Sequence, residues 1–203
     1  MLRASVLDGF LAGTMIAIGG SVLLSCDNRY LGAALFTVAL LSICLFGFNL
    51  YTGKVGFLVK EHSRDKLAVT FSGLLGNTLG TLIMGLLVGI ALPKLVDSAS
   101  AACVNRLGQT GLQTLIRGFF CGILMYTAVW VYREKGKIVG ILFCVPVFIL
   151  AGFEHSIADM FYFFLARSFG ADSFLFLTIV VLGNSLGGVF IPFIQALKGK
   201  ASV

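Results

Sequence analysis

Apolar residues occupy six long stretches of this chain, and short clusters of charged or turn-forming residues separate them. A helix needs about 20 mainly apolar residues to cross a lipid bilayer, and each stretch reaches that length. The pattern therefore predicts six membrane-spanning helices, near residues 6–25, 31–53, 67–92, 112–132, 138–166 and 173–197.

Composition excludes a water-soluble globule. Among the 203 residues, 58% are hydrophobic and only 12% are charged, whereas soluble domains carry about 25% charged residues. Six spans with short loops leave no room for a separate catalytic domain. We therefore expect one all-α polytopic membrane domain that covers residues 1–203.

The basic residues are divided unequally between the two sides that six spans would create. One side holds both termini and ten of these residues, namely Arg3, Lys54, Lys60, Arg64, Lys66, Arg133, Lys135, Lys137, Lys198 and Lys200. The other side holds five, namely Arg29, Lys94, Arg106, Arg117 and Arg167. Because basic loops stay cytoplasmic, we expect an integral protein of the plasma membrane with both termini in the cytoplasm. The net charge of +6 forms no basic stripe, so it predicts contact with anionic lipid headgroups and no nucleic-acid partner.

The first apolar stretch loosely resembles a lipoprotein signal, since it follows Arg3 and ends at Cys26. Asp8 and the Gly19-Gly20 pair interrupt the apolar core that such a signal requires. We therefore expect this stretch to be retained as the first span.

The five cysteines are scattered along the chain, with neither a Cys-x-x-Cys motif nor a nearby histidine. Such spacing is typical of buried apolar thiols, and it predicts neither a disulfide framework nor a metal site. The sequence implies no cofactor.

Three motifs of the first half recur in the second half at offsets of 109, 105 and 107 residues. They are Gly9-Phe10 and Gly118-Phe119, Gly47-Phe48-Asn49 and Gly152-Phe153-Glu154, and Gly76-Asn77-Thr78-Leu79-Gly80 and Gly183-Asn184-Ser185-Leu186-Gly187. Each half has three spans, so the second half would be inserted upside down, as in many transporters and channels. The pattern predicts two inverted repeats, at about 1–97 and 105–203, with the pathway where they meet.

The glycine-asparagine motifs favour helix packing over substrate binding. Their glycines recur at spacings of one, three or four residues, which lets helices approach closely. We expect Asn77 and Asn184 to bind neighbouring backbone groups rather than a substrate.

Span five contains three ionisable residues within six positions, namely Glu154, His155 and Asp159. Ionisable groups are costly in lipid, so these should face the protein interior or water. A histidine changes charge near neutral pH, which favours a proton-active or anion-contacting site over a polar cluster that only joins helices.

The matching part of span two places polar residues between Gly47 and Gly53. This pattern indicates a helix interrupted within the membrane, whose free backbone N–H groups could meet an anion. The alternative is a simple helix end, because Lys54 follows directly. The match to span five favours the interruption, and we assign Asn49 and Thr52 to the pathway centre together with Glu154 and His155.

These motifs resemble those of the formate/nitrite transporter family. Residues 152–160, Gly-Phe-Glu-His-Ser-Ile-Ala-Asp-Met, look like its span-five signature, which usually has Asn where this chain has Asp159. Residues 49–53 resemble its span-two loop, in which Phe is common at the position of Tyr51. Residues 183–188 resemble its span-six motif, and residues 13–20 fit its first span more loosely. The resemblance covers essentially the whole chain.

The resemblance implies an aquaporin-like protomer of six helices, assembled as a homopentamer in which each protomer has its own pore. The family passes small monovalent anions of weak acids, namely formate, nitrite, hydrosulfide, and lactate or acetate in some members. By the family pattern, two apolar constrictions enclose a central histidine. Matched by spacing, Phe36, Val129 and Phe148 fall at one constriction, Leu40 and Leu50 at the other, and Thr52 and His155 at the polar centre.

Two positions depart from the family pattern. Many members carry Asn in span four where this chain has Tyr126, whose larger side chain and hydroxyl would alter pore size or substrate choice. Many also carry Lys ahead of span four, where ungapped alignment places Gln109 and Arg106 is the nearest cation. Tyr126, Tyr51 and Arg106 are therefore candidates for pore or selectivity residues.

A mechanism follows from the cost of moving charge through an apolar constriction. An anion would approach Thr52 and His155, acquire a proton from His155 or from water relayed there, and pass the second constriction as a neutral acid. This reading predicts a channel or transporter for a small anion, formate first, and no enzyme activity.

Three other functions fit the sequence less well. A neutral-solute or water channel would share the fold, but a central histidine between apolar rings suits a weak acid better. An integral-membrane enzyme would act at Glu154, His155 and Asp159, but no nucleophile motif or metal-ligand set accompanies them. A purely structural subunit would leave the charged span-five motif without an explanation.

Overall fold

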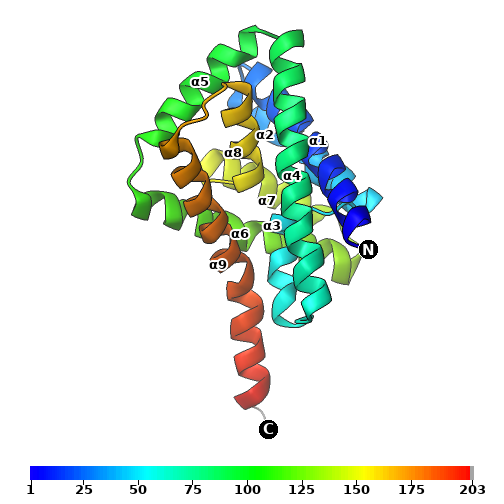
Figure 1. The fold of residues 1–203 in the computed structure, drawn as a ribbon. Coiled ribbons are helices and arrows are strands. Elements are labelled where there is room, and N and C mark those ends of the chain that lie inside the picture. The colour runs from blue at the N-terminus through cyan, green and yellow to red at the C-terminus, as the bar shows by residue number, and fades with distance from the viewer. Residues whose placement is uncertain (202–203) are drawn as a thin grey trace.

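The computed structural model describes residues 1–201, with side chains described as far as Lys198, and nearly all of these residues are helical (Figure 1). The elements are α1 (Leu2–Ser25), α2 (Arg29–Phe46), α3 (Tyr51–Lys54), the 3-10 helix η1 (Val55–Val59), α4 (Arg64–Ala91), α5 (Lys94–Leu107), α6 (Gly111–Lys135), α7 (Val139–Ala151), α8 (Ser156–Leu165) and α9 (Ala171–Ala201).

Five of these helices, α1, α2, α4, α6 and α9, are long and apolar enough to cross a membrane by themselves. The α7 and α8 pair is long and apolar enough to count as a sixth span when taken together, with a bend of 57° at the break between the two helices. The all-helical polytopic fold predicted from the apolar stretches is therefore confirmed. The predicted interruption of the second span, 31–53, is present, because α2 ends at Phe46, a left-handed Gly47 follows and α3 begins at Tyr51.

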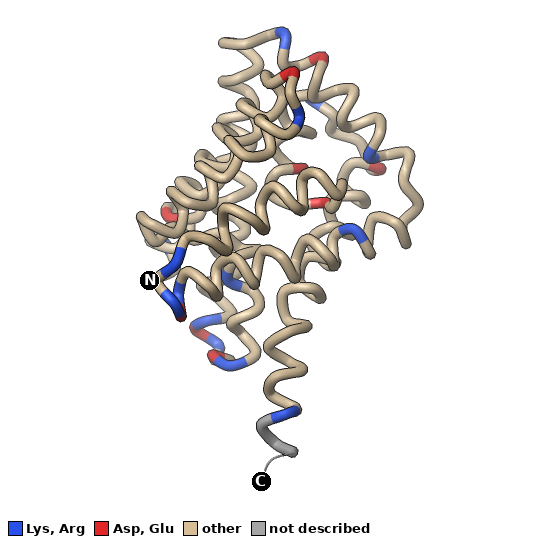
Figure 2. Tube along the Cα trace, turned by 180° about the vertical axis from the view of Figure 1, so that it is seen from behind, with Lys and Arg blue, Asp and Glu red and all other residues tan. Residues whose placement is uncertain are grey.

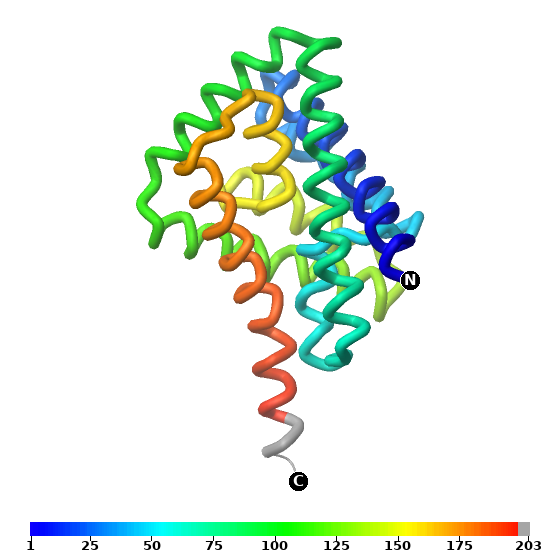
Figure 3. Tube along the Cα trace, in the orientation of Figure 1, coloured from blue at the N-terminus to red at the C-terminus, as the bar shows by residue number. Residues whose placement is uncertain are grey.

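Glycines let α1 pack against α4, and α6 against α9, with their backbones in contact. A Cβ atom added to Gly76 would collide with the carbonyl oxygen of Val6, and one added to Gly187 would collide with that of Phe119. These glycines act as packing faces, as expected. The two helix pairs occupy opposite sequence halves, and α4 and α9 run in opposite directions in Figures 1 and 3.

The helix α5 was not predicted, because its sequence is too polar to resemble a span. Its buried residues Leu95, Ala99 and Cys103 nevertheless recur every four positions, which is the pattern of an amphipathic helix. Through this face α5 packs on α8, and its last turn brings Arg106 to the residues that follow the break in span five.

Most Lys and Arg residues lie toward the two ends of the molecule, and few charged residues lie between them (Figure 2). Along α4, for example, Leu75, Leu79, Ile83 and Ile90 are exposed and form one stripe. An apolar exposed face of this kind fits lipid or another apolar surface rather than water. The distribution agrees with an integral membrane protein.

Candidate functional site

Two spans are interrupted at equivalent places. Gly47 and Gly152 each adopt a left-handed conformation with φ of 75°, which ends α2 and α7. Three residues then continue in a non-helical segment before α3 or α8 begins. The backbone groups freed by each break need partners, because no water is present in the bilayer core.

Asn77 of α4 supplies those partners at the first break. Its Oδ1 atom accepts a hydrogen bond from the Tyr51 N–H at 2.9 Å. Its Nδ2 atom donates to the carbonyl oxygens of Asn49, at 2.9 Å, and Gly9, at 2.8 Å. One side chain therefore joins the start of α3 to both α4 and α1.

Asn184 of α9 does the same at the second break. Its Oδ1 atom accepts from the Ser156 N–H at 2.8 Å, and its Nδ2 atom donates to the carbonyl oxygens of Glu154, at 2.8 Å, and Gly118, at 2.9 Å. Both asparagines thus bind backbone groups, as the sequence predicted. The matching bonds make Leu50 the structural counterpart of His155.

His155 and Thr52 meet at the point where the two breaks face each other. The Thr52 Oγ1 atom lies 2.8 Å from His155 Nε2, and both residues are almost completely buried. The Ala158 N–H donates to His155 Nδ1 at 3.2 Å. Because Nδ1 accepts this bond, a neutral His155 carries its proton on Nε2 and donates it to Thr52.

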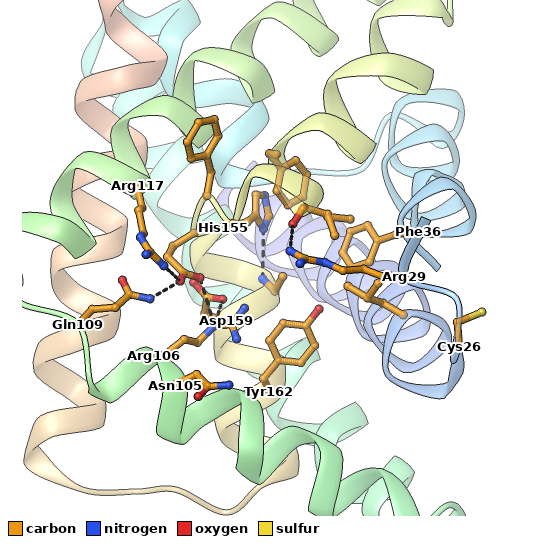
Figure 4. A pocket seen from close by; sticks show the side chains of 17 residues that line it. Cys26, Arg29, Phe36, Asn105, Arg106, Gln109, Arg117, His155, Asp159 and Tyr162 are labelled. Atoms are coloured by element: carbon orange, nitrogen blue, oxygen red, sulfur yellow. Dashed lines mark hydrogen bonds and ion pairs between the residues drawn. The ribbon is translucent and has the colours of Figure 1, made fainter. Parts of the chain in front are cut away.

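Aromatic rings cover His155 on one side. The Phe148 ring stacks on the imidazole with centroids 5.6 Å apart, and Phe36 meets Phe148 edge to face at 6.2 Å. These three rings line a hollow of about 370 Å³, which we call the His155 hollow (Figure 4). The rings of Phe36 and Phe148 therefore form an apolar part of the wall next to His155.

A charged network occupies the wall of the His155 hollow. Arg106 Nε lies 2.8 Å from Asp159 Oδ1 and 3.2 Å from Glu154 Oε2. Gln109 donates to Glu154 Oε1 at 2.6 Å, and Arg117 lies 3.8 Å from the same oxygen. The second Asp159 oxygen, Oδ2, is buried without a hydrogen-bond partner among the described residues. The positive charges of Arg106 and Arg117 therefore balance the negative charges of the two carboxylates.

Arg29 adds a further positive charge to the His155 hollow. Its Nη2 atom donates to the carbonyl oxygens of Ile149, at 3.0 Å, and Leu150, at 3.3 Å, at the end of α7 (Figure 4). Free carbonyl groups at a helix end attract a cation. No carboxylate pairs with Arg29 within the described part of the chain, so the hollow carries a net positive charge.

A second, smaller hollow of about 100 Å³ lies at the other break. Leu40, Leu50, Val129, Lys54 and Arg133 are among its lining residues, and we call it the Leu50 hollow. Leu40 and Leu50 are each only 1% exposed. No residue lines both hollows within the described part of the chain.

Comparisons with known proteins show the family to which the chain belongs. The sequence profile described as "Formate/nitrite transporter" matches residues 1–196. The chain belongs to the formate/nitrite transporter family. This family consists of channels and transporters for small anions, so this member is a transport protein of the membrane and not an enzyme.

Individual relatives cover much of the chain. The nitrite transporter NirC of Escherichia coli (strain K12) is 30% identical over 76% of this chain and 65% of its own length. The formate channel BtFdhC of Bacillus thuringiensis is 27% identical over 92% of this chain and 83% of its own. A solved pentameric formate channel with formate bound superposes with a TM-score of 0.79 at 25% identity, over 97% of this chain and 96% of that one.

Several residues assigned to the pathway of this transporter lie elsewhere. The side chain of Asn49 donates to Ser5 Oγ at 2.5 Å and to the Val69 carbonyl at 2.9 Å, so it ties the break to α1 and α4. Successive side chains of an extended segment point to opposite sides. For this reason Asn49 points away from the side that Leu50 occupies. Glu154, in contrast, lies in the wall of the His155 hollow, where it pairs with Arg106.

The two tyrosines proposed as pore or selectivity residues line neither hollow. The Tyr51 hydroxyl lies 2.7 Å from Ser185 Oγ, where it joins α3 to α9. The Tyr126 ring packs on Phe57 with centroids 5.2 Å apart. Both side chains are directed into helix packing, which spacing along a helix could not reveal.

Val129 also differs from its assignment. It lies in the Leu50 hollow, close to Gly53, rather than with Phe36 and Phe148. Spacing along α6 does not fix the depth at which this helix meets the break in span two.

Arg29 is the residue of the site that the sequence analysis missed, because its position at the start of a span suggested only a role in orientation.

Proposed function

We propose that this chain conducts the anion of a small weak acid, with formate as the first candidate and nitrite or hydrosulfide as further ones. The observation that carries the proposal is the buried hydrogen bond between Thr52 and His155, with the rings of Phe36 and Phe148 on one side and the apolar side chains of Leu40 and Leu50 in the other hollow. A neutral solute would need no titratable residue at this place. The names of the nitrite and formate relatives support the same class of substrate.

The first step of the proposed route is attraction. Arg29, Arg106 and Arg117 line the His155 hollow with Glu154 and Asp159, and the net positive charge that remains raises the local concentration of anions. The anion then meets Phe36 and Phe148, which offer no group to replace its hydration shell. The cost of desolvation blocks a bare anion at this point.

The second step is protonation beside Thr52 and His155. Formate takes one proton and becomes neutral formic acid, which passes Leu40 and Leu50 with little desolvation cost. The neutral ring has no proton to spare while Nδ1 accepts the Ala158 N–H. Direct transfer therefore requires that His155 first gains a second proton at Nδ1, which breaks this bond. The alternative is a proton relayed by water beside the ring.

The proposal also covers the location of the protein in the cell and its assembly. We place it in the plasma membrane with both termini cytoplasmic, on the basis of its ten-to-five distribution of Lys and Arg. We take residues 1–203 as one domain of two inverted repeats that works as a homopentamer. The similar pentameric formate channel supports this assembly. Mass measurement in detergent should then give five copies, and a monomer would contradict it.

Flux into proteoliposomes tests the proposed function. We expect uptake of labelled formate, competition by nitrite or hydrosulfide, and no swelling in glycerol. Phe36→Ala and Phe148→Ala should make the route less selective against larger ions, because each removes a ring from the wall of the His155 hollow. Exposed Phe174→Ala serves as a control of the same chemistry outside that hollow. Glycerol uptake without formate uptake would favour a neutral-solute channel and contradict the proposal.

A further inference from the structure

A third hollow, of about 240 Å³, lies at the end of the molecule where the break in span two leads into α4. Residues from four elements line it, including Lys54 of α3, Phe57 and Leu58 of η1, Lys66 of α4 and Arg133 of α6. Glu61, from the loop before α4, lines it too, and we call it the Glu61 hollow. Lys54 and Arg133 also line the Leu50 hollow, so the Glu61 hollow adjoins the proposed route. Its other residues, among them Glu61 and Lys66, line neither hollow of that route.

Three cations and one carboxylate meet in the Glu61 hollow. Glu61 lies 3.2 Å from Lys66 Nζ and 3.1 Å from Arg133 Nη2. Within the described part of the chain, Lys54 forms no ion pair. The four groups together leave a net charge of about +2 at neutral pH.

The ionised state of Glu61 follows from its neighbours. Burial alone would raise the pKa of this carboxyl group, but hydrogen bonds from Lys66 and Arg133 and their charges lower it below its ordinary value. The carboxylate is therefore already ionised at neutral pH. Glu61 neutralises one of the three positive charges, and the net positive charge that remains is available to a ligand.

The cationic groups stand beside an apolar wall. Phe57, Leu58 and Val69 line the same hollow, and the Arg133 guanidinium lies over the Phe57 ring, 4.1 Å from its centre. This stacking holds Arg133 in place without using all of its N–H donors. The side chains of Lys66 and Arg133 remain 59% and 43% exposed, so the hollow is open to a ligand from outside.

We propose that the Glu61 hollow binds a phosphate group. Basic pockets between spans at a membrane surface suit anionic headgroups. The α4 helix leaves this end as a transmembrane span, which puts the hollow at the level of the headgroups. The adjoining wall of Phe57, Leu58 and Val69 suits the glycerol and upper acyl region of a phospholipid, so a phospholipid headgroup fits better than free phosphate. The proposal needs only that the chain is embedded in a membrane.

Lipid binding to the full-length protein in detergent tests this site. Delipidated protein is titrated with phosphatidylglycerol and, as the neutral reference, phosphatidylcholine with the same acyl chains, and bound lipid is measured by native mass spectrometry. We expect phosphatidylglycerol to bind more tightly. Lys54→Gln/Lys66→Gln should weaken its binding by about thirtyfold, since both side chains line the hollow and would contact the bound phosphate group directly.

Two controls separate this site from general charge and from misfolding. Lys60→Gln/Lys137→Gln removes the same charge from exposed residues outside the hollow, and it should leave phosphatidylglycerol binding unchanged. Glu61→Gln removes the internal carboxylate and should tighten binding, a gain that an unfolded protein could not produce.

A parallel titration with inorganic phosphate identifies the source of the phosphate group. Phosphate binding that falls in Lys54→Gln/Lys66→Gln, without preference for phosphatidylglycerol, would support the site with free phosphate as its ligand. The proposal is overturned if neither probe binds selectively, or if the control pair of substitutions weakens binding as much as the test pair. Because no flux is measured, either result is independent of the proposed transport function.

Discussion

Both ring nitrogens of His155 are already engaged by the protein. Nδ1 accepts from the Ala158 N–H, and Nε2 faces the Thr52 hydroxyl. A permeant anion that takes a hydrogen bond at this point therefore displaces Thr52 from Nε2 or shares its hydroxyl. The histidine and the threonine form one unit, and loss of either should affect transport.

Thr52→Val keeps the shape of the side chain and removes the hydroxyl. We expect formate uptake to fall by about tenfold, because an unpaired buried N–H costs about 1–3 kcal/mol and leaves the ring without the partner that orients it. Initial uptake into proteoliposomes measures the effect. Thr81→Val is the matched control, since Thr81 is equally buried but bonds only within its own helix. Equal uptake by the two variants would contradict the role of Thr52.

Asp159→Asn tests the charge balance of the His155 hollow. The amide oxygen can still accept from Arg106, but one negative charge is lost from a wall that already carries Arg29. We expect the half-saturating formate concentration to fall by about fivefold at low ionic strength, equivalent to about 1 kcal/mol. The gain should shrink in high salt. Asp172→Asn, which removes the same charge outside the hollow, is the control and should leave the half-saturating formate concentration unchanged. An unchanged or higher half-saturating concentration in Asp159→Asn would count against electrostatic attraction.

At the scale of elements, the two interrupted spans depend on asparagines from other helices. The start of α3 is held by Asn77 of α4, and the start of α8 is held by Asn184 of α9. Each asparagine also binds a carbonyl group in a third helix, α1 or α6. The position of His155 is therefore set by packing between spans as well as by its own helix.

Asn184→Ala removes three buried hydrogen bonds around the break in span five. We expect a loss of about 3 kcal/mol of stability, since each polar group left unpaired costs about 1 kcal/mol or more, and a lower unfolding temperature in detergent. Asn77→Ala should act similarly at the other break. Asn105→Ala changes an exposed asparagine and should have little effect. An unfolding temperature that is unchanged in Asn184→Ala would mean that the break is held in another way.

The sequence predicted the positions of the helices and of their breaks better than the directions of individual side chains. Long apolar stretches defined the spans, and Gly47 and Gly152 marked the breaks, because only a residue without Cβ adopts their conformation readily. The amphipathic helix α5 was missed, since its three buried residues give a weak signal. The side-chain direction of Asn49 was also beyond the sequence, because it depends on where the extended segment begins.

At the scale of the whole molecule, the basic residues separate into two groups at opposite ends of the spans (Figure 2). Arg29, Arg106 and Arg117 surround the His155 hollow, whereas Lys54 and Arg133 line the Leu50 hollow. An anion thus meets positive charge at either end of the proposed route. The orientation decides which hollow faces the outside.

A topology experiment tests that orientation. With both termini cytoplasmic, a C-terminal green fluorescent protein fusion should fluoresce, and a C-terminal alkaline phosphatase fusion should be inactive. The reverse pattern would place the Leu50 hollow outside. A reporter inserted between Leu107 and Gly111, at the opposite end, should give the complementary result and serves as the internal control.

The pH dependence of formate uptake, in the unmodified chain and in His155→Phe, tests protonation at the centre most directly. With protein-free vesicles as the blank, uptake should rise as the outside pH is lowered from about 8 to about 6, because each formate that crosses takes up a proton. In His155→Phe, uptake should fall by at least about tenfold and lose this dependence, since the phenyl ring can neither donate nor relay a proton. Uptake that changes neither with pH nor with the substitution would contradict protonation at His155.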